Sequence, residues 1–338
     1  MISLLLVNYR SAALAATAIR TARAASSRPL EVVAVDNSLD PRESEGLREH
    51  ADVVITSASN RGYAGGINDG RRACSGEILI VTNPDVVYHD RAIDRLVEAL
   101  QNDAAVAGPA FFWDNALTWR LPPADLYTGL EKLDEILASR SRAWFEQRDQ
   151  RRIRTRIRFW SLETTTRVRA LSGAVLAIRA ADFDRAHGFD ERFALYFEEN
   201  DFLRRIAALR RRIVYVPAAR CRHLYNQSAG QESEQAAARF AQSEMRYVEK
   251  WNGPFAARFL KRIERPLPPF AGPRASTNPD HIVLEASPLS SFSTAAGSFL
   301  ATGIPPEVWD SYRAPALYLR TIDRATGRVV ATDVRYRT

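Results

Sequence analysis

The stretch VTNPDVV, residues 81–87, places Asn83, Pro84 and Asp85 between two apolar pieces. Proline lacks a backbone donor and is disfavoured inside central strands, although it is tolerated where a strand ends. The three residues therefore mark the end of the apolar run 77–82. Three earlier apolar runs, at 2–7, 30–35 and 52–56, also end in polar residues.

The pattern of these runs indicates the fold class. They are short, do not alternate with polar residues, and are separated by helical patterns such as the amphipathic stretch 93–100. Runs of this kind are typical of a parallel sheet buried on both faces. The sequence predicts an α/β fold with a mostly parallel central sheet flanked by helices. Ligands of such sheets bind beyond the carboxyl ends of the strands.

Composition and charge limit the function classes. The chain has 338 residues, of which 46% are hydrophobic and 26% charged, as in ordinary globular proteins. Its two cysteines, Cys74 and Cys221, imply no disulfide framework. We expect a cytoplasmic location, with peripheral attachment at the cytoplasmic face of the membrane left open. The formal net charge of +7 indicates an anionic partner, namely nucleic acid, a membrane surface or a phosphorylated substrate.

The pattern along the chain divides it into three parts. Residues 1–262 form the predicted α/β domain, in which 111–170 are an insertion on the acceptor side. Inside the insertion, Arg152, Arg154, Arg156 and Arg158 alternate with mostly apolar residues, which predicts a strand with one basic face. That face is either solvated or paired with nearby glutamates, or it is a dock for anionic lipid headgroups or a lipid-diphosphate acceptor. Prolines mark 263–280 as a linker, and residues 281–338 predict a small β-rich module.

Two residues could hold a metal ion. A carboxylate at the mouth of a parallel sheet, here Asp85, is a good ligand for Mg²⁺ or Mn²⁺, which commonly bridge to substrate phosphates. The alternative for this stretch is ordinary turn chemistry. A lone histidine is usually structural, but His223 follows the predicted strand 212–216 and could complete a mixed nitrogen and oxygen site with Asp85.

Three acids, Glu198, Glu199 and Asp201, come before a helical pattern. Acids favour the first turn of a helix because of its dipole, which is the structural explanation. The functional explanation is a general base, since adjacent carboxylates raise each other's pKa. The glycine-rich segment NRGYAGGINDG, residues 60–70, is either a flexible turn or a loop that lets the backbone approach a ligand.

Taken in order, seven pieces of the sequence resemble the family-2 inverting glycosyltransferases of the GT-A fold, especially their rhamnosyltransferase-like branch. The resemblance covers about residues 1–250. The pieces are VNYR, VDNS, NRGYAGGINDG, TNPDV, LSGAVLAIRA, GFDERFALYFEENDFLRR and the late His223.

The resemblance implies a role for each matching residue. Asn8 and Asp36 would line the pocket for the base and ribose of the nucleotide. Asn60, Gly62 and Asn68 would shape a loop over the nucleotide. Asn83 would belong to the DxD-like motif, and Ser172 and Gly173 would form the floor near the donor sugar. Asp85 would bind Mg²⁺ or Mn²⁺ on the donor diphosphate, with His223 beside it.

The base position departs from the family pattern. The family usually has Glu-Asp there, and this chain has Glu198-Glu199. The second position normally carries the base, so the resemblance implies Glu199, with Glu198 as the alternative. Asp201 is expected to be structural.

The implied reaction is a metal-dependent, inverting transfer of a sugar, with rhamnose as the best guess. The donor would be a TDP- or UDP-sugar, and the acceptor a cell-surface polysaccharide or a lipid-linked glycan. One alternative is an inactive scaffold that binds nucleotide sugars. Another is a basic nucleic-acid-binding protein, but no helix-turn-helix, zinc-finger or RNP pattern is present, so no nucleic acid is expected. The sequence gives no oligomeric state.

Overall fold

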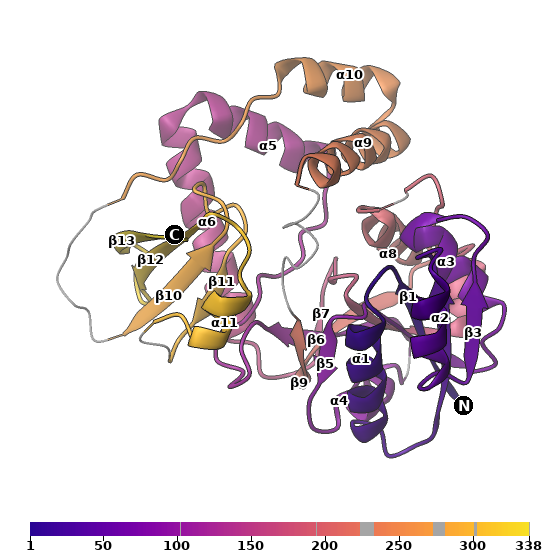
Figure 1. Ribbon diagram of the computed structural model, residues 1–338. Helices are drawn as coiled ribbons and strands as arrows, with labels where there is room; N and C mark the ends of the chain where they lie inside the picture. The colour runs from indigo at the N-terminus through magenta and orange to yellow at the C-terminus, as the bar shows by residue number, and fades with distance from the viewer. Residues whose placement is uncertain (102, 194, 224–232, 273–280, 301–302, 338) are drawn as a thin grey trace.

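The computed structural model describes residues 1–101, 103–193, 195–223, 233–272, 281–300 and 303–337. They form a large sheet flanked by helices and a smaller antiparallel sheet near the C-terminus (Figure 1). The predicted α/β fold with a β-rich C-terminal extension is confirmed.

The first part of the chain builds four parallel strands. β1 (Ile2–Asn8) lies between β2 (Leu30–Asp36) and β4 (Ile78–Thr82), and β3 (Val53–Thr56) pairs with β2. All seven residues of β1 are buried, because helices cover both faces of this sheet. Those helices include α1 (Ala12–Ala24), α2 (Pro41–Arg48), α3 (Gly62–Arg71) and α4 (Ala92–Ala99).

The rest of the large sheet is mixed. β8 (Val175–Arg179) is antiparallel to both β4 and β6 (Ala104–Phe112), whereas β9 (Arg212–His223) is parallel to β6. β5 (Val86–Tyr88) and β7 (Thr166–Arg167) pair antiparallel with β9. Pro84 therefore lies in the connection between β4 and β5, where its missing donor breaks no strand ladder.

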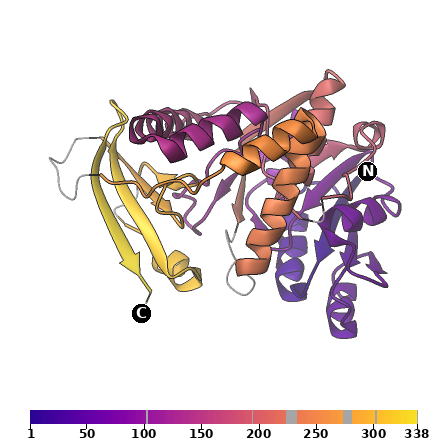
Figure 2. The ribbon, with the colours of Figure 1, turned by 90° about the horizontal axis from the view of Figure 1, so that it is seen from above.

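Further helices follow β6 along the chain. α8 (Glu198–Ala208) follows the short α7 (Ala180–Arg185) and packs on the central sheet. α5 (Gly129–Arg140), α9 (Ser233–Asn252) and α10 (Pro254–Ile263) gather on one side of the molecule, as both ribbon views show (Figures 1 and 2). A shared cluster that includes Ile136, Val248 and Leu260 holds these three together.

The predicted basic strand at 152–159 is wrong, because these residues belong to the helix α6 (Arg142–Trp160). Ile153, Ile157 and Trp160 follow helical spacing and pack together against the C-terminal sheet. The four arginines therefore point in different directions. Arg156 is buried, whereas Arg154 and Arg158 are exposed.

The C-terminal sheet has the strand order β11-β10-β12-β13. Its strands are β10 (Ile282–Ser287), β11 (Ala296–Ser298), β12 (Ala316–Asp323) and β13 (Val329–Tyr336), with the short helix α11 (Pro306–Ser311) beside them. One face packs on α6, where the Trp160 ring comes so close to Gly297 that a Cβ there would lie 2.2 Å from it. The sheet stands at the end of the molecule opposite the N-terminal strands (Figure 2).

No helix within the described ranges is both long enough and apolar enough to cross a bilayer.

Candidate active site

Strand pairing brings the two predicted metal ligands together. The register of β5 and β9 pairs Val86 with His223, so Asp85, one residue before β5, lies beside the imidazole. His223 Nε2 is 3.3 Å from a carboxylate oxygen of Asp85, and both side chains are partly exposed. The ring of Phe111 lies 5.7 Å from the His223 ring, centre to centre, and limits its movement.

This pair fits a divalent metal ion. One nitrogen and one oxygen donor close together can bind the same Mg²⁺ or Mn²⁺, and both ions commonly take further ligands from substrate phosphates and water. Within the described ranges, no group of three or more His, Cys, Asp or Glu side chains surrounds a possible metal position. The residues therefore suit an ion shared with a phosphorylated substrate better than a closed structural site.

The two candidate bases open α8 in different environments. Glu198 is only 6% exposed, and its Oε2 has no hydrogen-bond partner in the described part of the chain. Glu199 is partly exposed, and its side chain lies against Gly173, where an added Cβ would sit 3.1 Å from the Cβ of Glu199. Burial raises the pKa of both carboxyls, and the neighbouring Glu199 charge raises the pKa of Glu198 further.

The backbone before these acids is unusual. Tyr196 and Phe197 both have positive φ, 68° and 69°, although neither is glycine. Left-handed backbone in consecutive non-glycine residues costs energy and is held by surrounding packing. Phe197 provides that packing, since its ring contacts Tyr127 and Tyr247. The turn fixes where α8 begins and so where Glu199 points.

Tyr63 is the residue that the sequence reasoning missed. Its hydroxyl donates to the carbonyl of Gly173 at 3.4 Å. Burial raises the pKa of Tyr63 well above its usual value, and the charges of Glu198, Glu199 and Asp85 raise it further. Tyr63 and Glu199 therefore both contact Gly173. The only signal of Tyr63 in the sequence is an aromatic residue inside the glycine-rich segment 60–70.

Asn83, Ser172 and Gly173 lie together where β4 and β8 meet. The backbone N–H of Asn83 donates to the carbonyl of Ala174 at 2.9 Å, and the Ser172 hydroxyl accepts from the Ala174 N–H. These bonds join the end of β4 to the segment that leads into β8. The predicted floor residues therefore adjoin Glu199 and the connection that carries Asp85.

Asn8 and Asp36 lie at the ends of β1 and β2 and are fully buried. The Asn8 amide donates to Asp36, Ser38 and Glu43. Burial acts to raise the pKa of Asp36, but hydrogen bonds from Ser38, Ser44 and Asn8 prevail and lower it. Both side chains thus hold the segments that follow β1 and β2 through buried hydrogen bonds.

Residues 62–71 of the glycine-rich segment form the helix α3 instead of a loop. The nucleotide-binding role of Asn60, Gly62 and Asn68 stays a prediction. Asn60 accepts from the N–H of Gly62 at 2.9 Å, and Gly62 has the positive φ of 72° that glycine tolerates best. Asn68 exchanges two hydrogen bonds with the backbone of Phe189 and donates to Glu191. Asn68 therefore fixes the loop that leads towards α8.

Comparison with known proteins adds family evidence to this geometry. Residues 3–171 match the model of "Glycosyl transferase family 2". The chain is 27% identical over 225 residues to the N-acetylglucosaminyl-diphospho-decaprenol L-rhamnosyltransferase of Mycobacterium tuberculosis, covering 62% of this chain and 71% of the relative.

Two solved structures show partial similarity at 16% identity each. They are the mannosyltransferase PcManGT from Pyrobaculum calidifontis in complex with GDP-Man and Mn²⁺, and TarS 1-349 from S. aureus. The TM-scores are 0.47 and 0.42, with 77% and 70% of this chain and 69% and 64% of the other chain covered. The family match spans half of the chain, and it includes β1, α3 and the Asn83–Asp85 connection. The chain therefore belongs to glycosyl transferase family 2 and is a glycosyltransferase with a GT-A-type α/β fold.

Proposed function

We propose that this enzyme transfers a sugar from a nucleoside-diphosphate sugar to a glycan or lipid-linked acceptor, with inversion at the anomeric carbon. The observation that carries the proposal is geometric: Asp85 lies beside His223, and Glu199 and Tyr63 both contact Gly173, in the segment that is hydrogen-bonded to the chain before Asp85. A metal-binding pair and a carboxylate base in one site supply what a single displacement needs.

Glu199 is the proposed base. It takes the proton from the acceptor hydroxyl while that oxygen forms a bond to the anomeric carbon. The bond to the diphosphate oxygen breaks, and the nucleoside diphosphate leaves with the electron pair. Glu199 suits this role better than Glu198, because it is partly exposed while Glu198 is buried. No second carboxylate is required, since no covalent glycosyl-enzyme forms.

Asp85 and His223 are the proposed ligands of a Mg²⁺ or Mn²⁺ ion. When bound, such an ion neutralises negative charge that develops on the diphosphate. The proposed donor is a TDP- or UDP-sugar, with rhamnose favoured because the mycobacterial relative is a rhamnosyltransferase. The same relative's name supports a lipid-linked acceptor.

Contact with a membrane surface is part of this proposal. The exposed side of α10 carries Phe255 and Phe259, which are 84% and 60% exposed. Exposed basic side chains lie next to them on the same helix and just after it, namely Arg258, Lys261, Arg262 and Arg265. Aromatic and basic groups on one side of a helix suit the interface of an anionic bilayer. This surface replaces the arginines of α6 as the proposed dock.

One experiment tests the function directly. Wild type and Asp85→Ala are titrated calorimetrically with UDP- and TDP-sugars, with and without Mn²⁺, and Glu45→Ala serves as an exposed acidic control. We expect Mn²⁺-dependent binding in wild type and control and its loss in Asp85→Ala. Unchanged Mn²⁺-dependent affinity in Asp85→Ala would contradict the metal site. Binding without transfer to any acceptor would favour an inactive scaffold.

A further inference from the structure

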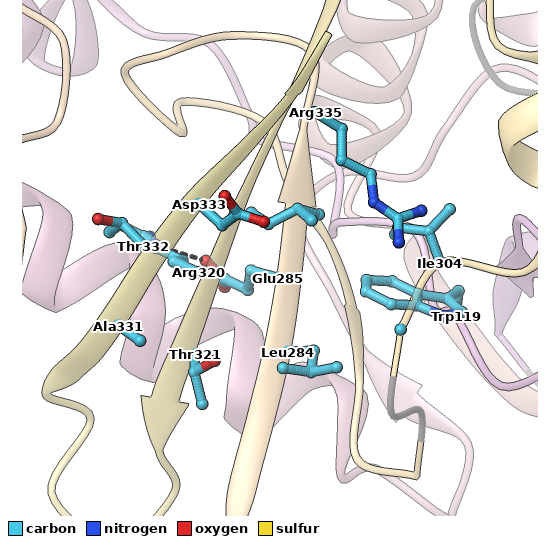
Figure 3. Close-up of a pocket in the computed structure, with 12 residues that line it drawn as sticks. Trp119, Leu284, Glu285, Ile304, Arg320, Thr321, Ala331, Thr332, Asp333 and Arg335 are labelled. Carbon is cyan, nitrogen blue, oxygen red and sulfur yellow. Dashed lines mark hydrogen bonds and ion pairs between the residues drawn. The ribbon is translucent and has the colours of Figure 1, made fainter. Parts of the chain in front are cut away.

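A cavity of about 360 Å³ lies on the C-terminal sheet, on the face that α6 does not cover (Figure 3). Its volume is at the lower end of the range for small-molecule sites. The residues that form it come from β10, β12, β13, the chain before α11 and the segment after β6. These segments are distant along the chain, so no local sequence pattern predicts the cavity.

Strand register explains the floor of the cavity. Leu284 and Ala331 both pair with Thr321, and Leu319 pairs with Asp333, so these side chains share one face of the sheet. The floor is therefore apolar around a single hydroxyl. The alternate residues of the strands point to the other face, where Glu285 and Arg320 form ion pairs.

The wall contains an unpaired buried donor. Trp119 is only 1% exposed and lines the cavity, and its indole N–H meets no acceptor in the described residues. Buried polar groups nearly always have a partner, so an unpaired one beside a cavity indicates a place for a ligand oxygen or a water. Thr321 supplies a second polar group close by.

The rim carries one charge of each sign. Asp333 and Arg335 are both exposed on β13 and line the cavity. The guanidinium of Arg320 is already bound by Asp149 and Glu285, so it adds no free positive charge. An anionic ligand would face the Asp333 carboxylate. A neutral ligand with many hydroxyls can instead accept from Arg335 and the indole and donate to Asp333.

We propose that this cavity binds a neutral sugar unit of the acceptor glycan, apart from the site of transfer. The less polar face of a sugar ring would lie on Leu284 and Leu319, and its hydroxyls would reach the polar groups of the wall and rim. This inference rests on the proposed function for the acceptor's chemistry.

One segment of chain runs from beside the active site to the cavity. Phe111, near the end of β6, lies beside His223, and the chain after β6 reaches Trp119 through a turn closed by the hydrogen bond from the Trp113 N–H to the Trp119 carbonyl. Arg120 then bridges Phe112 of β6 to Gly297 of the C-terminal sheet. A glycan whose end lies at Glu199 could therefore extend towards the C-terminal sheet, which stands beside β6, β7 and β9 (Figure 1).

Binding is tested apart from catalysis by saturation-transfer difference NMR on the full chain. The probes are rhamnose, N-acetylglucosamine, galactose and mannose, with inorganic phosphate, followed by ³¹P line broadening, as the anionic arm. The cavity variants are Asp333→Ala, Thr321→Val, Trp119→Phe and Arg335→Ala. Asp85→Ala is a variant of the transfer site, and Asp310→Ala is a control with an exposed acid of the same module outside the cavity. Circular dichroism checks that each variant is folded.

We expect at least one sugar to bind wild type, Asp310→Ala and Asp85→Ala. Its signal should be reduced at least severalfold in Asp333→Ala, Thr321→Val and Trp119→Phe. Equal signals in all variants, or none in wild type, would overturn the proposal. Phosphate binding lost in Arg335→Ala, without sugar binding, would overturn it in favour of an anion site. If wild type binds the sugar in the cavity but transfers no sugar from a nucleoside-diphosphate donor to any acceptor, the proposed function is contradicted and the cavity proposal stands.

Discussion

At the scale of single residues, Glu199 and Glu198 show how neighbours with the same chemistry receive different roles. Gly173 leaves room for Glu199 at the edge of the site. Glu198 instead turns into the protein, where its Oε2 has no hydrogen-bond partner among the described residues. Because both residues are glutamates and adjacent in the sequence, the sequence alone could not assign them different roles. Burial and direction, which depend on the turn at Tyr196 and Phe197, separate them here.

Replacing the base should affect the chemical step. We expect Glu199→Gln to lower kcat by about 100-fold or more, the usual contribution of general base catalysis, with little change in donor affinity. Because burial raises the pKa of Glu199, the wild-type rate should fall on acidification at a higher pH than an ordinary glutamate would cause. Steady-state kinetics across pH measures both effects. A nearly active Glu199→Gln beside an inactive Glu198→Gln would move the role to Glu198.

Glu198 should show its burial in the pH dependence of stability. Its pKa is raised in the folded protein, so the protonated form is favoured there and stability is lost as pH rises through that raised pKa. Glu198→Gln cannot ionise. The Tm of this variant minus that of wild type should therefore increase as pH rises from about 4 to about 8. Calorimetric scans test this, and a difference independent of pH would contradict it.

At the scale of secondary-structure elements, α6 is the clearest case of a helix with a strand-like pattern. Its arginines alternate at 152, 154, 156 and 158, but its apolar residues Ile153, Ile157 and Trp160 also satisfy helical spacing. Contact with the C-terminal sheet favours the helix, in which Ile153 and Trp160 pack on the sheet while Arg156 donates to the buried Glu285. The glycine-rich α3 is a similar case, in which packing of buried residues such as Ala64 and Ile67 outweighs low helix propensity.

The α10 surface leads to a prediction about membranes. Phe255→Ser with Phe259→Ser should reduce sedimentation with phosphatidylglycerol vesicles, because the variant loses apolar contact with the bilayer interface. The nearby basic groups could each add about 1 kcal/mol near an anionic surface, so binding should also weaken with salt.

Arg154→Ser with Arg158→Ser is the matched control, since both arginines are exposed on α6. It should sediment with vesicles nearly as wild type does. If the α10 variant and wild type sediment equally at low salt, α10 is not the dock. If neither wild type nor the α10 variant binds these vesicles, the proposed contact between α10 and an anionic membrane is contradicted.

At the scale of the whole molecule, a buried ion-pair network joins the insertion to the C-terminal sheet. Glu285 binds Arg156 of α6 and Arg320 of β12, and Arg320 also binds Asp149 of α6. The rings of Phe270 and Phe292 lie 4.9 and 4.2 Å from the Arg320 guanidinium. Residues on both sides of the predicted linker thus share one interior. The predicted boundaries at 262 and 281 stay a prediction.

Removing the Glu285 carboxylate, which lies at the centre of this network, should lower the free energy of unfolding. Glu285→Ala leaves Arg156 buried without its ion-pair partner, and breaking such a pair typically costs about 3–5 kcal/mol. Denaturant unfolding followed by tryptophan fluorescence measures the loss. Arg154→Ala, exposed on the same helix, should change the free energy of unfolding by no more than about 0.5 kcal/mol. A loss of similar size in both variants would show that the network contributes little.

The sequence by itself determined the parts of this protein that depend on local pattern. Buried strands must be apolar and must end where polar residues begin, so the runs before Asn8, Asp36 and Asn83 predicted the parallel strands and the edge that carries the site. The order of short motifs also predicted the family. These features need only neighbours along the chain.

Tertiary structure alone decided which distant residues meet. Asp85 and His223 are adjacent because β5 and β9 pair in one register, which no local pattern encodes. The packing of α6 and the cavity beside Trp119 likewise depend on contacts with the C-terminal sheet, whose residues are distant from them along the chain. The physical reason is that local propensities differ by small energies, whereas burying side chains and pairing charges at a long-range contact involves larger ones.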